Sequence, residues 1–309
     1  MKLFKPKFWG EKKNLISFLL SPLASLLQFL IKLKKKNSKR EMFSIPVICI
    51  GNIYLGGTGK TPLAIEVVNI LKKLNNKTAI IKKLYKNHID EFKLIESKNV
   101  TLFKDLSRST AIKKAIAAKY QCVVLDDGFQ DMSIHKDLNI VCFNEKQLIG
   151  NGLTLPAGPL RESISSLKKC QIVVINGKKN YEFEKKIKDI SNTIDIYYSK
   201  YLPVNIEKFQ NQNLLAFAGI GNPENFFNLL EMNNLRLYKK IVFPDHYNYS
   251  SRELNDMINF SKKNNLKIIT TEKDFYRIKH FELSQIHSLN VKLEILDVDK
   301  FENNIIRYL

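Results

Sequence analysis

The stretch that decides the fold is residues 45–61, which read IPVICIGNIYLGGTGKT. Its first part is almost entirely apolar and predicts a buried β-strand over Ile45–Ile50. The glycines that follow let backbone N–H groups close around phosphate oxygens, and a helix from about Thr61 to Leu74 adds positive potential at its N-terminus. The order of strand, glycine-rich loop and helix therefore predicts a phosphate-binding loop.

The predicted cofactors of this loop are ATP and Mg²⁺. Lys60 would reach the β- and γ-phosphates and act in catalysis, and the Thr61 hydroxyl would bind the metal. The usual pattern has glycine at position 54, where this chain has Tyr54, so the loop is a variant. The residues predicted to bind the nucleotide are Tyr54, Leu55, Gly56, Gly57, Thr58, Gly59, Lys60 and Thr61.

Two adjacent aspartates, Asp126 and Asp127, follow the apolar run Cys122–Leu125. Parallel strands end along one edge of a sheet, so these carboxylates would lie beside the phosphate loop. Carboxylate oxygens suit Mg²⁺, and we predict that both aspartates bind the metal together with Thr61. The other interpretation is a pair of turn or helix-capping residues.

Apolar runs alternate with helical patterns along the rest of the chain, which indicates a parallel sheet covered on both faces. The predicted fold class is α/β: a P-loop NTPase-like parallel sheet, a smaller second α/β domain and an N-terminal amphipathic helix. The further strands predicted are Ala79–Ile81, Val100–Phe103, Cys122–Leu125, Ile140–Phe143, Ile172–Ile175, Leu214–Ala218, Leu237–Phe243 and Lys267–Thr270. The further helices predicted are Ser109–Lys119, Pro223–Met232 and Ser251–Asn264.

The domain organisation follows from these patterns. We predict an N-terminal helix within 1–40, a nucleotide-binding domain over 41–180 and a second domain over 181–309, with a cleft between the last two. The more polar region Tyr181–Leu202 is expected to hold the inter-domain connection.

The segment Asn14–Ile31 is strongly apolar and has lysines on both flanks. A cleaved signal peptide does not fit, because lysines follow where small cleavage-site residues belong. A spanning helix would be of minimal length and contains Pro22. A helix lying in the membrane surface, with lysines on anionic headgroups, fits best; a buried core helix is the other alternative. The polar residues form one narrow stripe at helical spacing: Ser17, Ser21, Ser25 and Gln28.

The formal net charge of +20 favours anionic partners, although lysine-rich composition also follows from an AT-rich genome. No combination of aromatic and basic residues indicates nucleic-acid binding, so neither a nucleic-acid nor a protein partner is predicted. The cysteines lie in or beside apolar runs and form no CxxC pair, which predicts small core residues rather than a zinc site. They are Cys49, Cys122, Cys142 and Cys170.

Six motifs between Asn52 and Asp274 together resemble the lipid A 4'-kinase family. They are GNIYLGGTGKTP, LDDGFQD, NGLTLPAGPLRE, AGIGNPENFF, FPDHY and TTEKD. The resemblance implies transfer of the ATP γ-phosphate to the 4'-hydroxyl of a tetraacylated glucosamine disaccharide 1-phosphate, which yields lipid IVA. It also implies a substrate whose acyl chains lie in the bacterial inner membrane and whose sugars face the cytoplasm, so the protein is expected at the cytoplasmic surface of that membrane, among anionic lipids.

The resemblance implies further site residues. Asp90 is the expected base toward the acceptor hydroxyl, His246 is its expected partner, and Glu91 is the obvious substitute for Asp90. Asn52 and Arg161 are expected to bind substrate. Arg161 follows a turn containing two prolines, which would present it either to a phosphate or to a structural salt bridge.

The chain departs from the family pattern in three places. The stretch 82–86, Lys-Lys-Leu-Tyr-Lys, stands where the family has Ser-Arg-Gly-Tyr-Gly and is followed by a deletion. Ile89-Asp90-Glu91-Phe92 replaces Gly-Asp-Glu-Pro, and Asp131 replaces a histidine. The alternative functions are another P-loop ATPase or GTPase, although the guanine-specific Asn-Lys-x-Asp motif is absent, and a degenerate relative that binds ATP and lipid without turnover.

Overall fold

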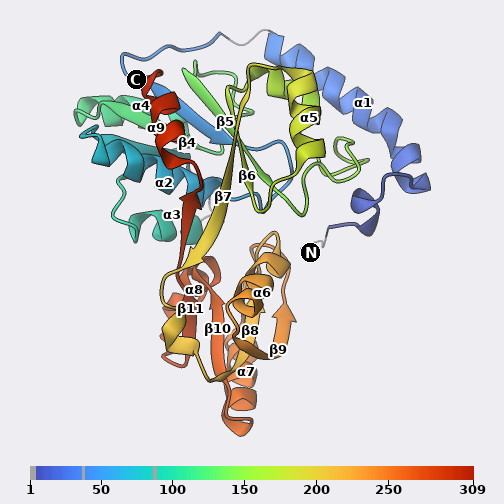
Figure 1. Cartoon of the computed structure of the whole chain (residues 1–309), viewed down its shortest axis with the longest axis vertical. Helices are drawn as coiled ribbons and strands as arrows, with labels where there is room; N and C mark the ends of the chain where they lie inside the picture. Colours follow the sequence, from blue (N-terminus) through green and yellow to red (C-terminus); the bar gives the residue numbers. More distant parts are fainter. Residues whose placement is uncertain (1–4, 37–38, 86–88) are drawn as a thin grey trace. The chain divides into compact units, whose positions relative to one another are not determined.

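The computed structural model describes residues 5–36, 39–85 and 89–309, with the backbone alone at 32 and 34–36 (Figure 1). The described chain divides into two compact units. The larger unit contains 5–84, 98–200 and 293–309, and the smaller contains 85–97 and 201–292. The chain therefore passes between the units several times. The two domains predicted from the sequence, 41–180 and 181–309, are contiguous, whereas 85–97 belongs to the smaller unit and 293–309 to the larger.

An eight-stranded sheet forms the core of the larger unit. Its strand order is β12-β7-β6-β5-β1-β4-β2-β3. β1 lies parallel between β4 and β5, with Ile50 opposite Asp126 on one side and Ile140 on the other. The strands are β1 (Val47–Gly51), β2 (Thr78–Lys83), β3 (Leu102–Asp105), β4 (Cys122–Asp126), β5 (Leu138–Asn144), β6 (Ile172–Asn176), β7 (Asp195–Pro203) and β12 (Val291–Ile295).

The central strands are buried because nearly every side chain in them is apolar. All five residues of β1 and of β4 are buried, which explains why their sequences show continuous apolar runs rather than alternation. The helices of this unit are α1 (Leu15–Lys36), α2 (Lys60–Lys73), α4 (Arg108–Ala117), α5 (Tyr181–Ile190) and α9 (Val298–Ile306). The predicted α/β class is confirmed, and the predicted strands and helices lie within a few residues of the observed ones.

The region 181–202, expected to hold the inter-domain connection, contains one crossing between the units, at 200–201, but most of it is regular structure. It forms α5 and most of β7, and β7 pairs parallel with β6 inside the large sheet. Its polar character has a simple cause, because only Phe183 and Ile187 of α5 are buried and the other side chains of this helix are at least partly exposed. The chain then enters the smaller unit at 200–201.

The smaller unit is built on a four-stranded parallel sheet of order β11-β10-β8-β9. Successive residues of β8 point to opposite faces. Leu214 and Ala216 join a cluster with α6, whereas Leu215 and Phe217 join one with α7. The elements are α3 (Ile89–Glu96), β8 (Asn213–Ala218), α6 (Pro223–Met232), β9 (Arg236–Val242), α7 (Ser251–Lys263), β10 (Lys267–Thr271), α8 (Glu272–Ile278) and β11 (Ile286–Leu289).

The N-terminal helix α1 is drawn in blue in Figure 1, and two residues of its polar stripe, Ser17 and Gln28, contact the body of the larger unit, whereas Ser25 is exposed. Asn151 Nδ2 donates to Ser17 Oγ at 3.1 Å, and Gln28 Nε2 donates to the carbonyl oxygen of Arg161 at 3.1 Å. The large apolar side chains point outward; Phe18 is 74% exposed and Phe29 57%. Over the described part of the chain, no helix is both long and apolar enough to cross a bilayer.

Candidate functional site

The phosphate loop connects β1 to the N-terminus of α2. Gly59 caps the helix with φ of 92°, a left-handed conformation that side chains disfavour. Inside the loop, Asn52 Nδ2 donates to the carbonyl oxygen of Tyr54 at 2.6 Å and to Thr58 Oγ1 at 2.9 Å. Asn52 is fully buried and its side-chain amide supports the loop from inside; its expected contact with substrate stays a prediction.

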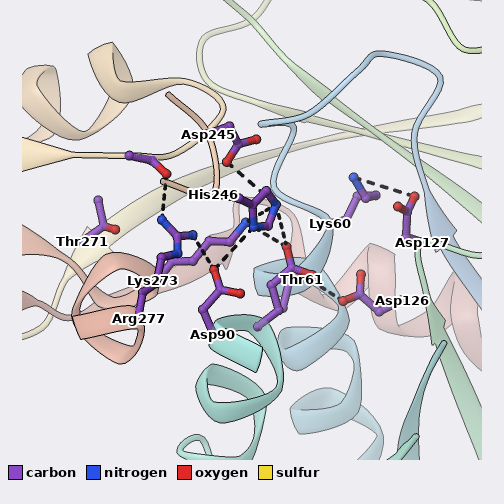
Figure 2. A network of polar contacts seen from close by, with 12 residues as sticks. Lys60, Thr61, Asp90, Asp126, Asp127, Asp245, His246, Thr271, Lys273 and Arg277 are labelled. Carbon is purple, nitrogen blue, oxygen red and sulfur yellow. Dashed lines mark hydrogen bonds and ion pairs between the residues drawn. The ribbon is translucent and has the colours of Figure 1, made fainter. Parts of the chain in front are cut away.

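The acidic pair lies at the end of β4, beside this loop (Figure 2). Thr61 Oγ1 donates to Asp126 Oδ2 at 2.8 Å, and Lys60 Nζ lies 3.8 Å from Asp127 Oδ1. The other oxygen of Asp126, Oδ1, is buried and has no hydrogen-bond partner among the described residues. A hydroxyl beside an unsatisfied, buried carboxylate oxygen fits the ligand chemistry of Mg²⁺.

Asp127 lies at the centre of a positive cluster. Arg161 Nη1 donates to both of its carboxylate oxygens, at 3.0 and 3.1 Å. Burial alone would raise the pKa of Asp127, but the positive charges of Lys60, Arg161 and Lys82 outweigh it and lower that pKa to about 2. Asp127 is therefore ionised at neutral pH and neutralises part of the positive charge around the loop.

The segment carrying Arg161 also supports the phosphate loop. The backbone N–H of Arg161 donates to the carbonyl oxygen of Ile53 at 2.7 Å, and that of Leu55 donates to Pro159 at 2.9 Å. Of the two interpretations of Arg161, this structure shows the salt bridge.

Arg108 holds the turn after β4 and was not identified from the sequence. Its Nη2 donates to the carbonyl oxygen of Asp127 at 2.7 Å, and its Nη1 lies 2.9 Å from Asp131 Oδ2. Asp131 is the residue that replaces the family's histidine. The substitution therefore forms a partly buried ion pair that fixes the acidic turn.

A second polar cluster lies in the smaller unit, around Asp90 in the first turn of α3 (Figure 2). Asp90 is only 3% exposed, and Arg277 Nη2 donates directly to its Oδ2. His246 Nδ1 lies 3.7 Å from the same oxygen, which is longer than a hydrogen bond. The structure thus brings Asp90 and His246 together although they are far apart in the sequence.

Arg277 is itself fixed by a buried network. Its Nη1 donates to Asp274 Oδ1 at 2.7 Å and to the carbonyl oxygen of Gly219 at 3.0 Å. Asp274 also accepts from the Gly219 N–H, the Tyr249 hydroxyl and the Thr271 hydroxyl at 2.8–3.0 Å. Burial raises the pKa of Asp274, and the Arg277 guanidinium and these donors oppose that shift. These contacts hold the Arg277 guanidinium in a fixed position from which it contacts Asp90.

His246 has left-handed backbone geometry, with φ of 56°, and its N–H donates to the carbonyl oxygen of Gly219 at 3.1 Å. Burial and then the charge of Lys273 lower the pKa of His246 to about 4. Lys273 Nζ is 3.4 Å from Nε2. Because an ammonium only donates, this contact assigns the proton of the neutral ring to Nδ1, which faces Asp90.

The substitute base Glu91 lies in the same cluster. Its Oε1 forms an ion pair with Lys273 Nζ at 2.8 Å and lies 4.0 Å from His246 Nε2. Lys273 and Asp274 belong to the TTEKD motif, for which no chemical role was predicted. The motif ends β10 and starts α8; its Lys273 contacts Glu91 and His246, and its Asp274 holds Arg277, which in turn contacts Asp90.

The chain is similar to known proteins over nearly its whole length. The family model for tetraacyldisaccharide-1-P 4'-kinase matches residues 16–105 and 90–309. A tetraacyldisaccharide 4'-kinase of Pelagibacter ubique is 44% identical, covering 99% of this chain and 98% of the relative. One from Rickettsia bellii is 33% identical, covering 96% and 95%. A crystal structure of LpxK from Aquifex aeolicus in complex with ATP is 22% identical, with a TM-score of 0.74 over 95% of this chain and 99% of that one.

Proposed function

The chain belongs to the tetraacyldisaccharide-1-P 4'-kinase family, and we propose that it transfers the γ-phosphate of ATP to the 4'-hydroxyl of tetraacyldisaccharide 1-phosphate in lipid A biosynthesis. The observation that carries this proposal is the family match over nearly the full length, joined to a complete phosphate loop with its acidic turn. Membership in this family sets aside the alternative of another P-loop ATPase or GTPase.

The nucleotide is assigned to the larger unit. The loop residues 54–61 would hold the phosphates, and Lys60 would neutralise charge on the transferring group. Thr61 and Asp126 would hold Mg²⁺, which supplies further charge neutralisation on the phosphates when bound. Asp127, held by Arg161, lies close enough to orient Lys60 toward the phosphates.

The acceptor hydroxyl is assigned to Asp90. A carboxylate can accept the proton of the attacking hydroxyl as the bond to phosphorus forms. His246 is neutral at pH 7, with its Nδ1 proton facing Asp90, so it can orient that carboxylate or share its proton. Both carboxylates have a cationic partner, but Asp90 Oδ2 lies nearer to His246 than Glu91 Oε1 does, at 3.7 Å against 4.0 Å, which favours Asp90 as the base.

Transfer to the acylated disaccharide, compared with bare ATP hydrolysis, tests the proposed activity. We expect the purified full chain to move ³²P from [γ-³²P]ATP to tetraacyldisaccharide 1-phosphate, and to release little inorganic phosphate without it. Hydrolysis with no labelled lipid product would contradict the proposal. Binding of ATP and lipid with neither reaction would identify a degenerate relative.

Arg277 is a positioning residue for Asp90, and Arg277→Lys tests this role. The ammonium keeps the charge but cannot bridge both Asp90 and Asp274, as the forked guanidinium does. We expect kcat to fall between about 10- and 100-fold, because a small misplacement of a reacting group has effects of that size. The KM for ATP should stay unchanged.

The matched control for this variant is Arg252→Lys, an exposed arginine on α7 in the same unit. It should leave kcat unchanged. Arg277→Met removes the charge altogether and should also lower the free energy of unfolding by about 3–5 kcal/mol, since it leaves buried carboxylates unpaired. Wild-type kcat in Arg277→Lys would show that the arginine is structural only.

The N-terminal helix is proposed to lie in the bilayer surface, at the cytoplasmic face of the inner membrane. Its outward face presents Leu15, Phe18, Leu19, Leu26 and Phe29, each more than half exposed. Burying a large apolar side chain contributes about 1.5–3 kcal/mol, so membrane contact would stabilise this face strongly. The lysines at 32 and 34–36, expected at anionic headgroups, have side chains outside the described structure.

Polar replacements on the outward face test membrane contact while keeping the inward contacts of Ser17 and Gln28. The triple variant Phe18→Ser, Leu26→Ser, Phe29→Ser should lose most of its co-sedimentation with vesicles containing phosphatidylglycerol. The control is Leu106→Ser, since Leu106 is 73% exposed but lies outside the helix. Equal vesicle binding by the triple variant and the control would refute the surface helix.

A further inference from the structure

A buried lysine lies in the proposed magnesium site. Lys82, near the end of β2, is 4% exposed and its Nζ forms an ion pair with Asp126 Oδ2. That oxygen also accepts the hydrogen bond of Thr61. β2 lies next to β4 with Ile81 opposite Leu125, so the pairing of the two strands directs Lys82 at Asp126.

Lys82 is a buried charge, and a buried charge needs a partner of opposite sign. An ammonium removed from water is stable only when a partner offsets its lost hydration, and here that partner is the buried carboxylate Asp126. The ion pair also stabilises the carboxylate. Without a cation, Asp126 and Asp127 would place two negative charges side by side, and Lys82 and Lys60 reduce that repulsion.

Mg²⁺ and an ammonium compete for such a carboxylate. Both are cations, and neither can approach Asp126 Oδ2 closely without weakening the contact of the other. Lys82 is one of the residues by which this chain departs from the family pattern, where serine is usual. The metal site of this chain therefore contains a positive charge that a serine would not supply.

We propose that Lys82 is a built-in counter-cation of the nucleotide site, which holds Asp126 in the nucleotide-free protein and must yield it when Mg²⁺ enters with ATP. This inference rests on the magnesium site proposed above. Lys82 stabilises the empty site and raises the Mg²⁺ concentration that the loaded site requires.

Direct binding measurements with Lys82→Met test the competition without relying on turnover. Methionine keeps much of the side-chain volume but removes the charge. Fluorescent mant-ATP is titrated with MgCl₂ in the full-length protein, and the Mg²⁺ concentration giving half-maximal binding is recorded. We expect that concentration to fall roughly tenfold or more in Lys82→Met, because one unit of like charge next to the metal is removed. Lys82→Arg, which keeps the charge, should remain near wild type.

The matched control is Lys104→Met, because Lys104 lies opposite Lys82 on the neighbouring strand β3 and is exposed. It should leave the Mg²⁺ requirement unchanged. Thermal unfolding gives a second readout that does not depend on nucleotide. Without Mg²⁺, Lys82→Met should unfold at a lower temperature than wild type, because Asp126 loses the positive charge beside it. Added Mg²⁺ should raise the unfolding temperature of Lys82→Met by more than it raises that of wild type.

Asp126→Asn separates failure of this inference from failure of the metal site. If Asp126→Asn keeps the wild-type Mg²⁺ requirement, the site itself is wrong. If Asp126→Asn loses Mg²⁺ dependence while Lys82→Met binds Mg²⁺ as wild type or more weakly, the site stands and the competition is refuted. If Lys82→Met does not fold, Lys82→Gln takes its place with the same expected direction.

Discussion

Lys60→Ala is expected to lower kcat by on the order of 10²-fold or more, because it removes a preorganised positive charge from the transition state of phosphoryl transfer. The side chain extends from the first residue of α2, and its Nζ lies 3.8 Å from Asp127 Oδ1. The fold should survive, since Asp127 retains its contacts with Arg161. The measurement is single-turnover transfer to tetraacyldisaccharide 1-phosphate at saturating ATP.

The control for this variant is Lys73→Ala, an exposed lysine in the last turn of the same helix. It removes the same side chain far along α2 from the loop and should leave transfer at the wild-type rate. If Lys60→Ala also transfers phosphate at close to the wild-type rate, the loop at 54–61 does not bind the transferring phosphate in the proposed way.

The nucleotide half of the site could be predicted from the sequence because it depends on local order. The strand, the glycine loop and the helix are contiguous, and the predicted start of the helix at Thr61 differs from the observed Lys60 by one residue. Asp126 and Asp127 follow from strand-end geometry. The role of Asn52 was less predictable, because a polar residue next to a glycine loop can face either the ligand or the loop interior, and here it bonds within the loop.

The residues that fix the site were not predictable, because their partners lie far away in the sequence. Lys82 appeared only as a departure from a pattern, and its meaning depends on the pairing of β2 with β4. Asp90 lies in a short polar stretch, where most aspartates are exposed. It is buried here because Arg277, 187 positions away, supplies its partner.

For the N-terminal helix, the sequence predicted the polar stripe but not the direction in which it faces. Its narrow polar stripe was evident from the spacing of Ser17, Ser21, Ser25 and Gln28. Spacing alone does not say whether a polar stripe faces water or protein. The structure shows Ser17 and Gln28 bonded to the body of the larger unit, which leaves the apolar face outward and makes the surface-helix proposal physically specific.

Asp90→Ala, His246→Ala and the double variant are expected to be about equally slow, with kcat lowered on the order of 10²–10⁴-fold, as for loss of one general base. The Asp90 Oδ2 and His246 Nδ1 atoms face each other at 3.7 Å. Residues that act as one unit give non-additive losses, because either deletion already removes the function of both. ATP affinity should persist in all three, since neither residue belongs to the phosphate loop.

The pH profile and Glu91→Ala decide whether this pair is the base. With the pKa of His246 lowered to about 4, the ring stays neutral above that pH. The wild-type kcat/KM should therefore show no acid limb from His246 near its ordinary value of 6.5. Glu91→Ala should keep far more activity than Asp90→Ala, because Glu91 pairs with Lys273 and lies farther from His246. Losses that multiply in the double variant would argue against a dyad, and an unimpaired Asp90→Ala would move the base to Glu91.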